Sequence, residues 1–117
     1  MPITSNLVQE TTTTTGTGNL TLSNVDGKVS FNTAFGNGST TNVFYYFVSH
    51  RTAAEWEVGE GHMSAASTLV RDTVSSSSNA GAAVNFSAGT MDVVSDLPAV
   101  KQINGRGEIL ALPYAMA

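Results

Sequence analysis

A run of five threonines at residues 11–15, followed by Gly16-Thr17-Gly18, is the feature that most restricts what this chain can fold into. β-branched side chains are stiff and suit the pleated surface of a strand better than a helix. The glycines permit a tight turn, so we predict a β-hairpin whose strands are residues 6–15 and 19–23. The threonine hydroxyls are interpreted as a solvated sheet face, not as an active site.

Similar short segments, separated by Gly, Asn and Ser, continue along the chain. Further strands are predicted at residues 29–35, 42–49, 55–61, 68–74, 82–86 and 90–94. Such a succession of short strands is typical of a β-sandwich, and 117 residues suffice for one hydrophobic core. We therefore predict an all-β, single-domain, jelly-roll-like β-sandwich over residues 1–98, with little helix and with extended termini.

Residues 42–49 are the most apolar run, and both alternating faces of this predicted strand are apolar. One face carries Val43, Tyr45 and Phe47, and the other carries Phe44, Tyr46 and Val48. A strand with two apolar faces is covered on both sides. We expect the opposite sheet to cover one face and a neighbouring subunit to cover the other.

The segment 55–61 alternates cleanly, with Trp56 and Val58 on one face and the glutamates on the other. This pattern predicts a half-buried strand that pairs with residues 42–49. The residues predicted as core anchors are Trp56, Val58, Phe44, Tyr46 and Phe86. The alternative for the aromatic set Phe44, Tyr45, Tyr46, Phe47 and Trp56 is an exposed sugar-binding platform, but contiguous rings on a central strand are more often buried.

The pattern changes after Pro98, and residues 99–117 show no clear alternation. We predict that this segment is an extended assembly tail, because no period would bury its apolar residues within the domain. The residues predicted to contact a partner, by groove binding or strand addition, are Ile103, Ile109, Leu110, Leu112 and Tyr114.

Charge and composition exclude several classes of partner. The net charge is −4 and only five residues are basic, scattered along the chain, so no nucleic-acid partner is predicted. No apolar run reaches the length of a membrane span, and the first residues do not resemble a secretory signal, so we expect a soluble protein made in the cytoplasm. Cysteine is absent from the sequence, which removes disulfides and thiolate chemistry.

Candidate catalytic and metal-binding side chains are few. His50 and His62 are expected at opposite ends of one hairpin arm, which is too far apart for a shared metal, and are interpreted as surface or rim residues. The carboxylates that could form a glycosidase pair are Glu55, Glu57, Glu60 and Asp72. Their spacing occurs on any solvated strand, so we predict no catalytic residues, no metal and no cofactor.

Several segments together resemble a module of tailed bacteriophages. They are Val8-Gln9-Glu10 followed by TTTTTGTG, EWEVGEG at 55–61, TLVRDTVSSSSNAGAAVNFSAGT at 68–90, and Asp96-Leu97-Pro98-Ala99. In order and spacing this set is similar to the N-terminal part of tail, neck or head-fibre proteins, over about residues 6 to 99. The resemblance implies a virion β-domain that docks an appendage onto the particle. This chain departs from the long fibre proteins because no shaft or receptor-binding tip follows the module.

The expected function is thus a non-enzymatic virion protein, an adaptor or short fibre-like element of the tail or neck. Its expected partners are other virion proteins of the tail, neck or capsid, and it is expected as a homo-oligomer or in symmetric copies. Two alternatives stay open: a capsid decoration or cement protein, and a carbohydrate-binding module that contacts the host envelope. A glycan hydrolase is the weakest alternative.

Overall fold

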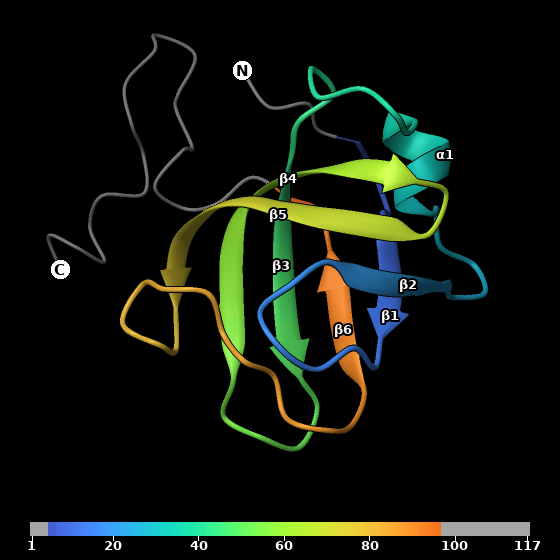
Figure 1. Cartoon of the computed structure of the whole chain (residues 1–117). Coiled ribbons are helices and arrows are strands. Elements are labelled where there is room, and N and C mark those ends of the chain that lie inside the picture. Colours follow the sequence, from blue (N-terminus) through green and yellow to red (C-terminus); the bar gives the residue numbers. More distant parts are fainter. Residues whose placement is uncertain (1–4, 97–117) are drawn as a thin grey trace, which may run out of the picture.

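Six antiparallel strands close on themselves in the order β1-β2-β5-β4-β3-β6, and β6 pairs back with β1 (Figure 1). This computed structural model describes residues 5–96. The strands are β1 (Gln9–Thr12), β2 (Leu20–Asn24), β3 (Phe44–His50), β4 (Trp56–Ala65), β5 (Thr68–Ser77) and β6 (Met91–Val94). One short helix, α1 (Phe31–Phe35), lies between β2 and β3.

The all-β, single-domain prediction is confirmed, but the jelly-roll sandwich is wrong, because the strands form one closed barrel. Closure depends on the long pair β4 and β5, whose register shifts at three places. Such β-bulges bend and coil a strand pair, which lets a sheet curl until its edges meet. The predicted hairpin of β1 and β2 and the pairing of β3 with β4 are both confirmed.

Side chains from every strand fill the barrel. The buried apolar core consists of Val8, Leu20, Leu22, Phe31, Phe35, Phe44, Tyr46, Val48, Met63, Leu69, Val84, Phe86, Met91 and Val93. The predicted anchors Phe44, Tyr46 and Phe86 belong to this core, so this part of the prediction is confirmed. Helix α1 lies at one end of the barrel, and the connection between β5 and β6 lies at the other (Figure 1).

The orientation predicted for β4 is wrong. Trp56 is 41% exposed, whereas Glu57 is fully buried. The reason lies in the glycines, since a Cβ on Gly59 would come within 2.2 Å of the Thr73 carbonyl oxygen and 2.8 Å of the Tyr46 hydroxyl. The Tyr46 ring occupies the space that two inward-facing glycines, Gly59 and Gly61, leave open.

Residues 29–35 were predicted as a strand, but residues 31–35 form helix α1 instead. Ser30 caps the helix by accepting a hydrogen bond from the Thr33 amide, and Gly36 ends it with a φ of 76°. The N-cap satisfies a backbone N–H, and the Gly36 N–H at the other end donates to the Asn32 carbonyl, so both ends of the short helix have partners. The spacing of Phe31 and Phe35 places both rings against Phe44, with centroids 5.0 and 4.6 Å away.

Residues 82–86 were also predicted as a strand, and they form none. Side chains bind this backbone in place of a neighbouring strand: Glu57 accepts from the Val84 amide, and Ser77 donates to the Ala82 carbonyl. The polar loop predicted from residue 75 begins later, because β5 continues to Ser77.

Candidate functional site

A buried ionic cluster of Glu57, Tyr46 and Arg71 lies inside the barrel. The Glu57 carboxylate accepts from the Arg71 guanidinium at 2.9 Å and from the Tyr46 hydroxyl at 2.5 Å. Burial, followed by the hydrogen bond to Glu57, raises the pKa of Tyr46 far above its ordinary value. The Arg71 side chain is only 3% exposed.

Arg71 also connects three parts of the chain. Its guanidinium donates to the carbonyl oxygens of Gly16 at 2.7 Å, Gly18 at 3.0 Å and Val84 at 3.1 Å. The same group lies over the Phe86 ring, 5.6 Å from its centroid. The guanidinium therefore holds the β1–β2 turn and the residue 84 region against β5.

This cluster is arranged for stability and not for substrate chemistry. The Glu57 carboxylate also accepts from the Val84 amide at 2.8 Å, so each of its oxygens already has a partner. A general acid or base must reach the substrate proton directly or through a water molecule. Fully buried Glu57 is closed to such contact. Glu57 is among the carboxylates predicted from the sequence, whereas Arg71 was not predicted. The signal for Arg71 is a basic side chain within the predicted strand 68–74, next to Asp72.

The other carboxylates predicted as candidates have separate partners. Glu55 accepts from the Ser87 amide and hydroxyl, and these hydrogen bonds lower its pKa. Asp72 contacts His62 Nδ1 at 2.7 Å. Glu60 lies on the outer face of β4, opposite Tyr45 of β3. The structure therefore does not assemble Glu55, Glu57, Glu60 and Asp72 into one site.

His50 is buried, which corrects the prediction of a surface or rim residue. Its Nδ1 accepts from the Thr52 and Ala53 amides at 3.1 and 3.0 Å. Its Nε2 donates toward the carbonyl oxygens of Ser87 and Ala88. The ring thus joins the β3–β4 turn to the segment before β6. The predicted separation of His50 from His62 is confirmed, since the two flank opposite ends of the paired region.

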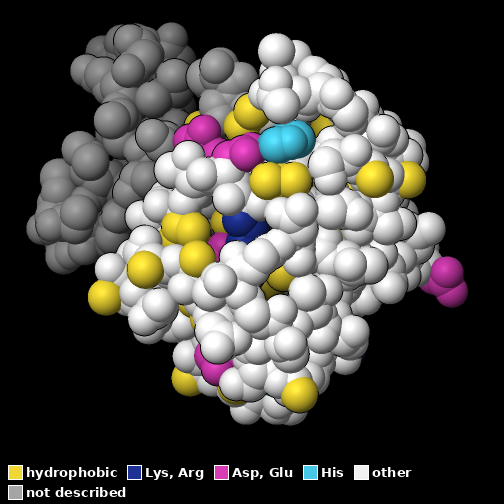
Figure 2. Space-filling model, viewed as in Figure 1, with side chains coloured by type: hydrophobic (Ala, Val, Ile, Leu, Met, Phe, Trp, Pro, Cys, Tyr) yellow, Lys and Arg dark blue, Asp and Glu magenta, His cyan; other side chains and the backbone are white. Residues whose placement is uncertain are grey.

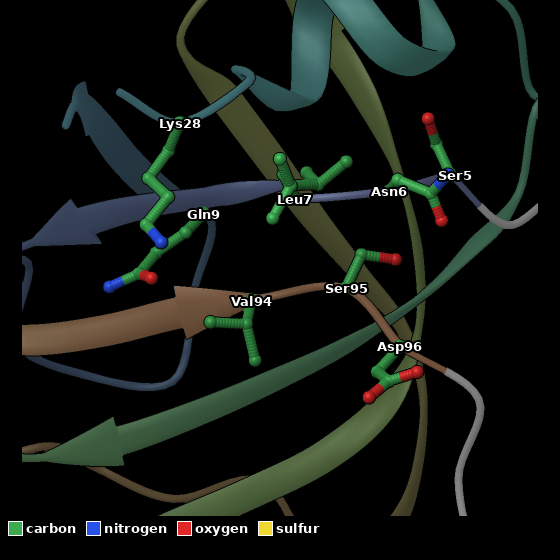
Figure 3. A pocket seen from close by; sticks show the side chains of 9 residues that line it. Ser5, Asn6, Leu7, Gln9, Lys28, Val94, Ser95 and Asp96 are labelled. Carbon is green, nitrogen blue, oxygen red and sulfur yellow. The ribbon is translucent and has the colours of Figure 1, made fainter. Parts of the chain in front are cut away.

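A groove lies where both ends of the described chain meet (Figure 3). We call it the terminal groove; it has a volume of about 430 Å³ and is lined by Ser5, Asn6, Leu7, Val8, Gln9, Lys28, Val94, Ser95 and Asp96. In Figure 3, Lys28 and Gln9 lie toward one end, and Ser5, Asn6 and Asp96 toward the other. The Ser95 amide donates to the Val8 carbonyl at 3.2 Å, which fixes the two chain ends beside each other.

Leu7 is the unusual residue of the terminal groove. Its φ is 58°, a left-handed conformation that residues other than Gly, Asn and Asp rarely adopt, and its side chain is 67% exposed. Hydrogen bonds from the Val29 amide to the Leu7 carbonyl and from the Gln9 amide to the Val29 carbonyl surround it. A strained backbone that presents an apolar side chain to solvent is an observation that points to function.

The aromatic set divides between the inside and the outside of the barrel. Phe44 and Tyr46 lie in the core, which confirms burial for them. Tyr45 and Phe47 alternate with them and therefore face outward, and Trp56 is exposed on β4. The predicted partner residues Ile103, Ile109, Leu110, Leu112 and Tyr114 lie outside the described residues.

Comparison with protein-family models, with curated proteins and with solved structures finds no match. Within residues 5–96, no helix has the length and apolar character needed to cross a membrane. The same part of the chain contains no group of three or more His, Asp or Glu side chains that could hold a metal ion.

Proposed function

We propose that this protein is a non-enzymatic structural component of a tailed-bacteriophage virion, an adaptor or short fibre-like element of the tail or neck. The terminal groove is its docking site for another virion protein. The observation that carries this proposal is Leu7, an exposed apolar side chain held in a strained conformation beside both chain ends. Strain of this kind amounts to about 1–3 kcal/mol and persists where the surrounding structure enforces it.

Two further features support a docking role. Backbone hydrogen bonds from Ser95 to Val8 and from Val29 to Leu7 hold the walls of the groove together, so a partner that binds there orders little of the chain. Figure 2 shows that most of the visible face is uncharged and that basic side chains occupy a small recessed spot. A surface with few charges suits close packing between neighbouring subunits.

The test separates docking from stability. Glycine adopts positive φ without strain, so Leu7→Gly removes the side chain while relieving the backbone. Ala80→Gly is the matched control, because Ala80 is exposed with a φ of 55° and lies outside the terminal groove. In phage carrying an amber codon in this gene, complementation with Leu7→Gly should give particles depleted of the protein, and Ala80→Gly should give normal content by quantitative mass spectrometry.

Normal incorporation of a folded Leu7→Gly protein would contradict docking through the terminal groove. Electron microscopy of antibody-labelled wild-type particles then tests where on the virion the protein lies. Label at the tail or neck supports the adaptor, whereas many copies over the head would favour the capsid decoration protein. Absence of the protein from purified particles would contradict the virion role.

A carbohydrate-binding module is the second candidate, because Trp56 is 41% exposed. Exposed tryptophan rings provide the flat apolar surface on which sugar rings stack. Binding to a glycan array that Trp56→Ala abolishes, without a change in melting temperature, would favour this candidate.

A further inference from the structure

The outside of the barrel carries an apolar face across three neighbouring strands. We call it the outer face and define it by Tyr45 and Phe47 of β3, Trp56 and Val58 of β4, and Val94 of β6. These residues alternate with inward-facing core residues on each strand, so their side chains point away from the core. One apolar face of β3 thus lies inside the barrel, where no opposite sheet is present, and the other lies outside. Its cover by a neighbouring subunit stays a prediction.

Strand register places these side chains side by side. Phe47 pairs with Val58 on one side and with Val94 on the other, so three apolar side chains form one row across β4, β3 and β6. The adjoining row begins with Trp56 opposite Ser49. Directly opposed side chains in a sheet lie about 5 Å apart, close enough to form one continuous surface.

Tyr45 belongs to the outer face and is only 3% exposed. Burial, and then the charge of Glu60 opposite it, raises the pKa of Tyr45. Glu60 lies on the outward side of β4, which agrees with an outward Tyr45. The Tyr45 side chain is therefore already covered. The apolar surface that the outer face leaves partly open belongs to Phe47, Val58, Val94 and Trp56.

The chain itself continues from this face. Val94 is the last residue of β6, and the Ser95 hydroxyl donates to the Tyr45 carbonyl at 2.6 Å, so the described chain ends beside the outer face. An extended chain spans about 3.3 Å per residue, whereas β6 and β4 are separated by about 10 Å. The remaining residues 97–117 are thus long enough to cross the whole face, and they include Ile103, Ile109, Leu110, Leu112 and Tyr114.

We infer that residues 97–117 fold back over the outer face of the same copy in the free protein, covering Phe47, Val58 and Val94 with Trp56 at the edge. The same copy is favoured over a second one because association of two molecules loses several kcal/mol of translational and rotational freedom, whereas closing a short loop costs little. Covering apolar surface contributes about 25 cal/mol per Å². This inference concerns the free chain and does not depend on the virion role.

Trp56 is the only tryptophan of the chain and so reports on the face directly. In the full-length protein, changing Ile109, Leu110 and Leu112 together to Ser should shift the Trp56 emission to the red. Iodide quenching of that emission should also rise, since the indole ring loses the cover that the segment provides. The matched control replaces three polar residues of the same segment, Lys101, Gln102 and Asn104, with Ser and should leave both signals unchanged.

A second variant alters the face instead of the segment. Phe47→Thr places another residue with high strand propensity on β3 while removing the centre of the apolar row, and should raise iodide quenching of Trp56 to a similar degree. Val25→Thr, in a half-buried position away from the outer face, is its control. Circular dichroism checks that each variant is folded. The inference would be overturned if the Trp56 signals were unchanged both in folded Phe47→Thr and in the folded variant with Ser at positions 109, 110 and 112.

Because the chain lacks cysteine, a single label can distinguish one copy from two. Bimane, which tryptophan quenches on contact, is attached at Ala111→Cys, between Leu110 and Leu112. Quenching that disappears in Trp56→Phe and does not change with protein concentration supports coverage within one copy. Quenching of labelled Ala111→Cys/Trp56→Phe after mixing with unlabelled wild type would place the segment on a second copy, and would overturn the inference.

Discussion

Two buried glutamates inside the barrel differ in the groups that bind their carboxylates. Glu57 is held by a guanidinium, a phenol and a backbone amide. Glu10 is also buried, and its carboxylate accepts from the Phe31 amide at 2.9 Å. Burial disfavours the charged form of a carboxyl group, and opposite charge restores it. The two residues should therefore respond differently to substitution.

Breaking the buried ion pair should destabilise the fold strongly. Arg71→Met leaves the Glu57 carboxylate buried without its cation, and a loss of about 3–5 kcal/mol in unfolding free energy is expected. Urea denaturation measures this. The double variant Glu57→Leu/Arg71→Met should lose less than the sum of the two single variants, because no unpaired charge remains. Arg51→Met, at the exposed pair with Asp92, is the control and should change little.

Glu10 should make the fold less stable as pH rises. Burial raises its pKa above the ordinary value of 4.5, although the Phe31 amide opposes this. Between 4.5 and the raised folded value, the native state binds more protons than the unfolded state, so the free energy of unfolding falls as pH increases. Glu10→Gln cannot lose a proton. The stability of Glu10→Gln relative to wild type, measured by urea denaturation, should increase with pH through this window and then level off.

At the scale of elements, the sequence predicted all six strand regions with shifted ends. Two further predicted strands, 29–35 and 82–86, do not form, and the reason for each failure is local. Residues 29–35 alternate like a strand, but Ser30 and Gly36 provide caps that favour a helix. The alternation of Trp56 and Val58 was read correctly as a strand and assigned to the wrong face. Only the position of the Tyr46 ring reveals why glycines and Glu57 point inward.

The glycines of β4 should not tolerate a side chain. Gly59→Ala places a Cβ against the Thr73 carbonyl and the Tyr46 hydroxyl, so the backbone of β4 or β5 must shift. Overpacking of this kind costs about 1–3 kcal/mol, measured as a lower melting temperature and urea midpoint. Gly18→Ala is the control, because an added Cβ meets nothing within 4 Å there. Equal stability of both variants would contradict the tight approach of β5 to β4.

The candidate sites were predicted less well than the strands, for a physical reason. The terminal groove and the outer face each combine residues from distant parts of the chain, such as Val94 and Phe47. Periodicity indicates that β3 has two apolar faces and pairs with β4, but it does not indicate that β6 lies on its other side. The strain at Leu7 has no sequence signal at all, because a leucine rarely has a positive φ.

At the scale of the whole molecule, the strand pairs that close the barrel differ in length. We call each pair of neighbouring strands a seam. The β3–β4 pair has six register positions, whereas β2 and β5 share two, Leu20 with Leu69 and Thr21 with Thr68. Arg71 crosses this weak seam from β5 to the carbonyl oxygens of Gly16 and Gly18. The cluster that stabilises the interior thus also holds the barrel shut at its shortest strand pair.

Local opening should therefore begin between β2 and β5. Regions with few backbone hydrogen bonds open with a smaller free energy than the global transition, and amide exchange reports this. The Leu22 amide, which donates to the Ser67 carbonyl at 2.8 Å, is the probe for the seam. Arg71→Lys keeps the charge but lacks the planar set of donors that reaches both glycines, so Leu22 exchange should accelerate at least tenfold. Exchange of the amides between β3 and β4 should become faster only by the factor that corresponds to the loss of global stability. Equal acceleration at both seams would show that the barrel opens as one unit and that Arg71 acts on stability alone.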